Sequence, residues 1–342
     1  MKRLAMILVG MIFNIMAVAQ DVQFSQFYAA PVFLNPAFAG ASEMTRFGVN
    51  YRNQWPGLNH SFQAYSAYVD HYFFNVNSGV AVIANGSRET MSGLNTSEIG
   101  MAYSYRLRLG FDNFLRFGGQ ASFVSRDANF ENLVFGSQID QMTGTVGDFS
   151  GENFGPDVRH RYVDYNVGML FNNDKLWLGL SAHHITQPNI SFVNDNISKW
   201  PIKYSAHGGV KFDLSGGGTQ RFMNQTFGRK ELLLAFNYKN QQPFQQLDLG
   251  AQINIQPLVV GVWYRGLPTP GASLPNNESL IGVLGISLGN GVDIGYSYDF
   301  TLSRLGVANT GGAHEVSMRF SFLAGNAGQG GRKVSSMPCF KY

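Results

Sequence analysis

The feature that most constrains this chain is the regular alternation of apolar and polar residues from Gln246 to Phe300. In its first part, Leu247, Leu249, Ala251, Ile253 and Ile255 take one parity, and Gln246, Asp248, Gly250, Gln252 and Asn254 take the other. A period of two is the signature of a β-strand. Four such runs follow one another, each of about ten residues. The stretch is therefore predicted to form a sheet with one apolar face and one polar, glycine-rich face.

The length of these runs distinguishes a membrane barrel from a soluble β-sandwich. Strands of soluble proteins usually have about five or six residues, whereas a strand that crosses a bilayer at a tilt of about 45° needs about nine to eleven. The connections also alternate between tight turns, such as Gln256-Pro257, and long loops, such as Gly266 to Glu278. Short turns at one end and long loops at the other are typical of outer-membrane barrels. We therefore predict an all-β, transmembrane antiparallel β-barrel of the outer-membrane type.

Composition agrees with a surface that faces lipid. Only 14% of the residues are charged, against about 25% in soluble domains. The formal net charge is +3, and no basic run of five or more residues occurs, so a nucleic-acid-binding surface is not expected. The single cysteine, Cys339, excludes an internal disulfide and a multi-cysteine metal site. We expect it to be a solvated residue of the C-terminal tail, the alternative being a reactive or coupled thiol.

The ends of the chain differ from the alternating part. Lys2-Arg3, the apolar run that follows and the small residues up to Ala19 are typical of a secretory signal peptide. The predicted organisation is a signal peptide at 1–19, a periplasmic or plug segment at 20–43, the outer-membrane β-barrel at 44–324 and a periplasmic tail at 325–342. After the signal, no apolar run reaches the length of a membrane helix, which is about 18 residues.

Counting the alternating runs gives a barrel of about 14 strands. With an even number of strands, the chain enters the first strand and leaves the last strand on the same side of the membrane. Both termini are therefore expected to be periplasmic. The run Phe62 to Tyr72 is ambiguous in its facing, and the run Gly79 to Asn85 is short. The connection Ser215 to Arg229 is long although it lies on the predicted periplasmic side. It is either a functional inner loop or the site of a misplaced strand.

The segment Gln23 to Gly40 is rich in aromatic residues but does not alternate, and its two prolines exclude a central strand. Its most characteristic residues are Gln23, Phe24, Ser25, Gln26, Tyr28, Asn35, Pro36, Ala37 and Gly40. This pattern resembles the opening motif of the PorP/SprF family, outer-membrane proteins associated with the type IX secretion system of Bacteroidota. The resemblance extends over essentially the whole chain. The segment is expected to enter the lumen as a plug or to dock a partner, the alternative being a passive leader into the first strand.

The resemblance implies a non-enzymatic protein without a cofactor that assists secretion and surface anchoring of specific type IX cargo. Such cargo includes large adhesins of the kind used in gliding motility. The implied partners are the C-terminal domain of the cargo, other components of the secretion system and outer-membrane lipid. The long outer loops 127–160 and 187–201 are expected to contact cargo. Protein interfaces favour aromatic anchors, so the aromatic residues of these loops are the candidates for this contact. The candidate residues there are Phe130, Phe135, Phe149, Phe154, Phe192 and Trp200.

Two other classes of function deserve comparison. An outer-membrane channel, or a transporter of hydrophobic solutes with an N-terminal hatch, has the same kind of barrel. An enzyme is disfavoured, because the Gly-x-Ser-x-Gly match at Gly285 to Gly289 lies within a strand rather than on the strand-to-helix turn that such a nucleophile needs. His183 and His184 are expected on opposite faces of a strand, which disfavours a shared metal. The inward carboxylates Asp164, Asp248, Asp293 and Asp299 are expected to be hydrated or to form salt bridges in a lumen that also holds Arg106, Arg108 and Arg116, the alternative being a catalytic pair among them.

Overall fold

The structure of the chain is a computed structural model. The structure describes residues 21–129, 134–140, 142–147, 159–192, 198–214, 220–222, 225–227, 230–267, 276–288, 291–303 and 305–322. The predicted signal peptide and the predicted C-terminal tail with Cys339 lie outside the described residues.

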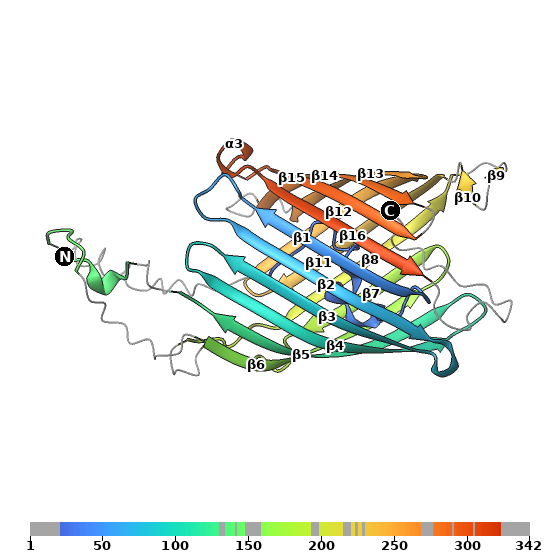
Figure 1. The fold of residues 1–342 in the computed structure, drawn as a ribbon, viewed down its shortest axis with the longest axis horizontal. Coiled ribbons are helices and arrows are strands. Elements are labelled where there is room, and N and C mark those ends of the chain that lie inside the picture. The colour runs from blue at the N-terminus through green and yellow to red at the C-terminus, as the bar shows by residue number, and fades with distance from the viewer. Residues whose placement is uncertain are drawn as a thin grey trace, which may run out of the picture.

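Fourteen strands form a closed antiparallel barrel, as predicted (Figure 1). They are β1 (Thr45–Gln54), β2 (Phe62–Phe73), β3 (Ser78–Glu89), β4 (Leu94–Arg108), β5 (Phe114–Asp127), β6 (Arg159–Asn172), β7 (Leu176–His183), β8 (Lys203–Asp213), β11 (Lys230–Gln241), β12 (Phe244–Ile255), β13 (Leu258–Leu267), β14 (Asn276–Leu288), β15 (Val292–Thr301) and β16 (Ala313–Phe322). Each strand pairs with its neighbours in sequence, and β1 pairs with β16 to close the sheet. Closure removes the sheet edges that lipid could not satisfy.

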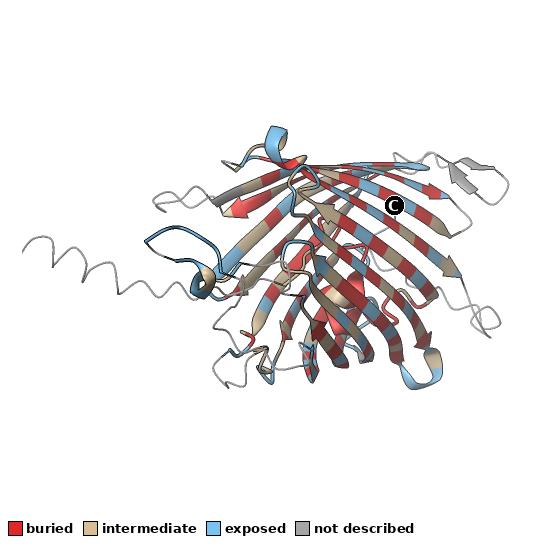
Figure 2. Cartoon of the chain, turned by 60° about the vertical axis from the view of Figure 1, so that its left-hand side comes forward, coloured by how far each residue is buried: buried red, intermediate tan, exposed pale blue. Residues whose placement is uncertain are grey.

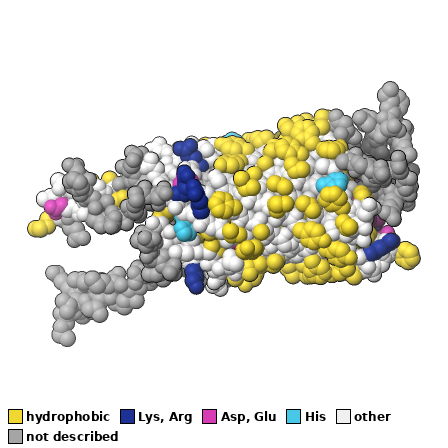
Figure 3. Space-filling view, turned by 60° about the horizontal axis from the view of Figure 1, so that its bottom comes forward, with side chains coloured by type: hydrophobic (Ala, Val, Ile, Leu, Met, Phe, Trp, Pro, Cys, Tyr) yellow, Lys and Arg dark blue, Asp and Glu magenta, His cyan; other side chains and the backbone are white. Residues whose placement is uncertain are grey.

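The alternation in sequence becomes an alternation between lipid and lumen. In β12, Leu249 and Ile253 are exposed on the outside, whereas Asp248 and Gln252 are buried inside. Figure 2 shows the same banding of buried and exposed residues along the strands. In Figure 3, hydrophobic side chains spread over the middle of the wall, and the Lys and Arg side chains visible on this face lie toward its ends. The outer surface thus has the apolar belt of a membrane barrel.

The structure corrects the predicted length of one strand, and it settles the facing of another strand and the nature of one long loop. The third strand is longer than predicted, because β3 pairs over its full length with β2. The facing of β2 is resolved, since Tyr68 and Tyr72 point inward and are buried. The loop between β8 and β11 contains a separate two-stranded sheet of β9 (Gln220–Phe222) and β10 (Gln225–Phe227). It adds no strand to the barrel, so no barrel strand was misplaced there.

The helices of the described chain are short. They are α2 (Pro31–Leu34), η1 (Pro36–Phe38), η2 (Phe74–Val76), η3 (Gly136–Gln138) and α3 (Val307–Thr310). Among the described residues, no helix is long and apolar enough to cross a membrane.

The segment before β1 runs through the barrel. We call the barrel end with the connections 74–77, 109–113 and 173–175 the turn end, and the opposite end the loop end. The segment enters β1 at the turn end, yet Asp21 contacts Lys203 and Gln241 at the loop end. The parity argument therefore holds for the first and last strands, because β1 begins and β16 ends at the turn end. It does not apply to Asp21, because strand parity does not constrain a segment inside the lumen.

Candidate functional site in the barrel lumen

The N-terminal segment, residues 21–44, is packed against the inner wall. Of the family-motif residues predicted above, all except Gln23 are buried. The segment contains little regular secondary structure, so most of its backbone and side-chain polar groups must find hydrogen-bond partners on the barrel wall. Its contacts fall into four groups between the loop end and the turn end.

Asp21 makes the first group, at the loop end. Its Oδ2 lies 2.5 Å from Nζ of Lys203 and 2.8 Å from Nε2 of His184. Its Oδ1 accepts hydrogen bonds from Nε1 of Trp200 at 2.8 Å and from Nε2 of Gln241 at 3.0 Å. One carboxylate therefore joins the start of β8, the end of β11 and the loop between β7 and β8.

The charges of this cluster stabilise one another. Burial alone would raise the pKa of the Asp21 carboxyl, but the positive charges of His184 and Lys203 hold it well below its usual range. Burial alone would lower the pKa of His184, but the charge of Asp21 and hydrogen bonds to Asp164 and Asp21 raise it to about 9. His184 is therefore a cation at neutral pH.

This cluster predicts how stability depends on pH. The stabilisation from charged His184 is fully present below its unfolded pKa, about 6.5, and is lost as the pH rises through about 9. The urea midpoint of the native barrel in detergent should exceed that of His184→Gln at pH 6, and the difference should shrink toward pH 10. A difference that stays constant over this range would contradict the assignment.

The second group surrounds the Gln-Phe-Ser-Gln motif. The carboxylate of Glu315 accepts hydrogen bonds from the backbone N–H groups of Ser25 at 2.6 Å and Gln26 at 2.9 Å. The Ser25 hydroxyl donates to Oδ2 of Asp299 at 2.7 Å, and the same oxygen lies 2.8 Å from Nη2 of Arg52. The motif thus supplies donors to carboxylates that project from β15 and β16.

Aromatic rings form the third group, in the middle of the lumen. Phe27 and Tyr28 pack on Trp263, with ring centroids 5.2 and 5.7 Å apart. Phe38 packs on Trp177 at 5.8 Å. These rings are nearly inaccessible to solvent, so the segment and the wall share one hydrophobic core. Such aromatic pairs are worth about 0.5–1.5 kcal/mol each beyond the area that they bury.

Asn35 shows why the motif contains Asn-Pro-Ala. Its Oδ1 accepts a hydrogen bond from the N–H of Ala37 at 2.8 Å and so caps η1, while Pro36 occupies the first helical position. Its Nδ2 donates to the carbonyl oxygens of Met169 and Leu180, both at 3.1 Å. Asn35 therefore shapes the segment and attaches it to β6 and β7.

The fourth group lies at the turn end. The N–H of Gly40 donates to Oδ2 of Asp70 at 2.7 Å, and the same oxygen lies 2.7 Å from Nη2 of Arg46. Glu43 forms ion pairs with Arg106 and Arg116. The segment is thus held by charged groups at both ends of the lumen and by aromatic packing between them.

The close approach of segment and wall predicts the effect of one glycine substitution. A Cβ at Gly118 would lie 2.3 Å from the backbone N of Ala37, whereas a Cβ at Gly119 would meet no atom within 4 Å. Gly118→Ala should lower the free energy of unfolding by about 1–3 kcal/mol and make the segment more sensitive to protease. Gly119→Ala is the matched control and should change neither property. Equal behaviour of the two variants would show that the segment does not pack against β5 as described.

The wall also carries buried ion pairs of its own. Asp248 and Asp299 both contact Arg265, and Asp293 contacts Arg319. All four predicted carboxylates, including Asp164, face inward. Their partners differ from those predicted, because Arg106 and Arg116 pair with Glu43 of the segment and Arg108 is exposed at the turn end.

The prediction that His183 and His184 point to opposite faces is wrong. β7 ends at His183, and His184 has a φ of 59°, which turns the chain out of the strand. Both side chains face the interior, where His183 contacts the carbonyl oxygen of Leu34 and His184 contacts Asp21. Among the described residues, no group of three or more His, Cys, Asp or Glu side chains could hold a metal ion.

The predicted aromatic contacts in the loops divide into three kinds. Phe130, Phe149 and Phe154 lie outside the described residues. Phe135 and Phe192 are partly exposed. Trp200 is buried, with 9% exposure, and its ring stacks on His184 at 4.7 Å. Trp200 therefore belongs to the cluster that holds Asp21.

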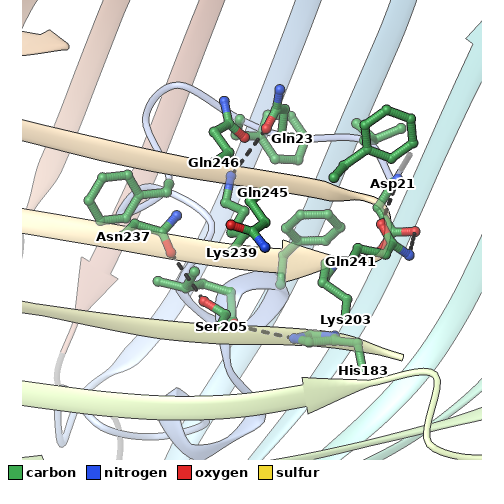
Figure 4. Close-up of a pocket in the computed structure, with 16 residues that line it drawn as sticks. Asp21, Gln23, His183, Lys203, Ser205, Asn237, Lys239, Gln241, Gln245 and Gln246 are labelled. Atoms are coloured by element: carbon green, nitrogen blue, oxygen red, sulfur yellow. Dashed lines mark hydrogen bonds and ion pairs between the residues drawn. The ribbon is translucent and has the colours of Figure 1, made fainter. Parts of the chain in front are cut away.

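A pocket lies beside the N-terminal segment at the loop end (Figure 4). The side chains of Asn237, Lys239 and Gln241 line it from one face of β11, and Gln23 and Asp21 of the segment lie beside Lys239 and Gln241. Sequence reasoning identified neither the pocket nor the wall residues Glu315 and Asp70 that bond to the segment, and it placed Asp299 in the lumen without its contact to Ser25. Their inward parity was the only available signal, because these contacts join residues far apart in the chain.

Comparison with protein families decides the relationship of this chain. A family described as type IX secretion system membrane protein PorP/SprF matches residues 17–320. The chain belongs to the PorP/SprF family. Its place there gives this PorP/SprF protein a role in the type IX secretion system and, with its barrel fold, a location in the outer membrane. No significant match occurs among curated proteins.

Solved structures similar to this PorP/SprF protein are outer-membrane barrels of low identity. Omp33 of Acinetobacter baumannii is 9% identical, with 82% of this chain and 100% of that chain covered and a TM-score of 0.42. A FadL homologue of Pseudomonas aeruginosa is 12% identical, with 86% and 94% covered and a TM-score of 0.45. A KdgM porin is 8% identical, with 81% and 99% covered and a TM-score of 0.35.

Proposed function

We propose that this PorP/SprF protein is a non-enzymatic adaptor that helps to secrete specific type IX cargo and anchors it at the cell surface. The cargo would bind through its C-terminal domain at the loop end of the barrel, with large adhesins, including those used in gliding motility, as the expected class. Other secretion components would contact the turn end.

The observation that carries this proposal is the N-terminal segment inside the lumen. It is bonded to the wall at both ends and packed on aromatic rings between them. A wide pore for solutes would need this space, whereas an adaptor needs a rigid barrel with a stable rim. The segment is thus proposed to serve as a plug that stiffens the barrel and holds its loop end in shape.

The test is an affinity purification of the tagged protein from detergent-solubilised outer membranes, followed by mass spectrometry. The proposal expects a large secreted protein that remains bound through its C-terminal domain. The control is the same purification after that domain has been deleted from the recovered partner. Recovery of the barrel alone, together with steady conductance in planar bilayers, would favour the channel or the transporter with an N-terminal hatch.

A further inference from the structure

The strand β6 is paired unequally on its two edges. It pairs with β5 along its whole length, from Arg159 to Asn172. It pairs with β7 only from Val167 to Asn172, because β7 ends at His183 and the chain turns away. The half of β6 nearest the loop end, Arg159 to Asn166, therefore has a strand neighbour on one edge only. Among the described barrel strands, this is the longest one-sided stretch.

The polarity of this open edge follows from one hydrogen bond. The carbonyl oxygen of Tyr165 accepts the N–H of Ile185 at 3.1 Å, so the backbone groups of Tyr165 point toward the β7 side. In an antiparallel ladder, alternate residues direct their backbone groups to the same side. Arg159, Arg161 and Val163 thus present N–H and C=O groups to the open edge, where no described residue bonds to them. Unpaired edges of this kind are templates for another strand.

The end of the open edge that carries Arg159 and Arg161 has the features of a position beyond the hydrocarbon layer of the membrane. The side chains of Arg159 and Arg161 point outward and are exposed. A cationic side chain that faces the middle of the lipid is costly, and an open sheet edge is not tolerated there. Both features are compatible with a position above the membrane surface, at the end that carries the long loops.

The charge of the edge selects a partner. Neither Arg159 nor Arg161 forms an ion pair with a described carboxylate. Asp127 lies opposite Arg159 in the ladder, and its Oδ2 accepts a hydrogen bond from Asn95 at 3.1 Å. Two arginines on alternate positions of a strand would pair with acidic side chains on alternate positions of a neighbour.

We infer that the open edge of β6 is a docking site for an extended acidic segment of the secreted partner, which adds to the barrel wall as a further strand. Backbone hydrogen bonds would supply affinity, and the two arginines would supply specificity and register. The inference rests on the proposed function for the identity of the partner but not for the chemistry of the site.

A synthetic peptide with glutamate at alternate positions of a short β-branched strand is the probe. Its binding to the full chain in detergent micelles is measured by fluorescence anisotropy. Arg161→Pro removes the N–H that faces the open edge, and proline is tolerated on an edge strand. The double variant Arg159→Glu with Arg161→Glu reverses the charge and keeps the backbone donors. Both variants should weaken binding by about tenfold or more.

Arg88→Glu is the matched control. Arg88 is exposed near the loop end of β3, but it has strand partners on both edges, Gln63 and Asn95. This variant should bind the peptide like the native chain. Equal binding by the native chain and by Arg161→Pro would overturn the inference, and so would no binding by the native chain. Either result could occur with cargo still recovered in the affinity purification, so the failure of this inference is distinguishable from the failure of the proposed function.

Discussion

Deletion of residues 21–43 is expected to convert a barrel without steady conductance into one that conducts ions. The deletion removes the segment that occupies the lumen and exposes a wall lined with charged side chains, among them Arg52, Asp299 and Glu315. A polar lumen of this kind fills with water. Purified protein in planar bilayers should show discrete steps for the deletion variant and silence for the full chain.

Two controls keep this result interpretable. Heat-modifiable migration on a gel checks that the deletion variant still forms a barrel. A second variant, Asp21→Ala with Glu43→Ala, leaves the segment in place but removes a charged attachment at each end. It should show brief openings that the full chain lacks. Steady conductance of the full chain, equal to that of the deletion variant, would show that the segment does not close the lumen.

Replacement of Arg265 by Met should cause the largest loss of stability of any single change considered. Its guanidinium is fully buried and contacts Asp248 at 2.8 Å, Asp299 at 3.3 Å and the carbonyl oxygen of Phe24 at 3.3 Å. Removal of one partner from a buried ion pair leaves an uncompensated charge, which costs about 3–5 kcal/mol. Urea unfolding in detergent should show a loss of this size.

The matched control for this change is Arg88→Met, at an exposed position of the same barrel. It should change the free energy of unfolding by no more than about 0.5 kcal/mol. Adding Asp248→Asn to Arg265→Met should recover part of the loss, because Asp248, whose remaining cationic partner is Lys239 at 3.6 Å, becomes neutral, whereas Asp299 keeps Arg52 at 2.8 Å. A loss under about 1 kcal/mol for Arg265→Met would contradict the described network.

The barrel could be predicted from the sequence because lipid-facing positions recur at every second residue of each strand. Every lipid-facing position must be apolar, so strands such as β12 and β15 show their facing without any knowledge of their neighbours. The facing of β2 was ambiguous because Tyr68 and Tyr72 are aromatic yet point inward, where they pack beside the N-terminal segment and its cationic neighbours. When both faces of a strand carry apolar or aromatic residues, the sequence no longer alternates clearly and does not show which face points to lipid.

The contacts of the N-terminal segment could not be predicted in the same way. Alternation places Glu315 in the lumen, but it does not say that the carboxylate will meet the backbone of Ser25 and Gln26. Only the composition of the segment, with its aromatic residues and Asn-Pro, indicated specific packing. The orientation of the His184 side chain was predicted wrongly for a different reason. A positive φ at a strand end reverses the facing that simple alternation predicts.

The role in secretion is tested most directly by comparing cells with and without this protein. The measurement is the amount of each type IX cargo protein on the cell surface and in the medium, by quantitative mass spectrometry. The adaptor account predicts that one or a few large secreted proteins disappear from the surface when the barrel is absent, and that the full-length barrel restores them. An unchanged surface, accompanied by reduced uptake of a solute, would contradict it.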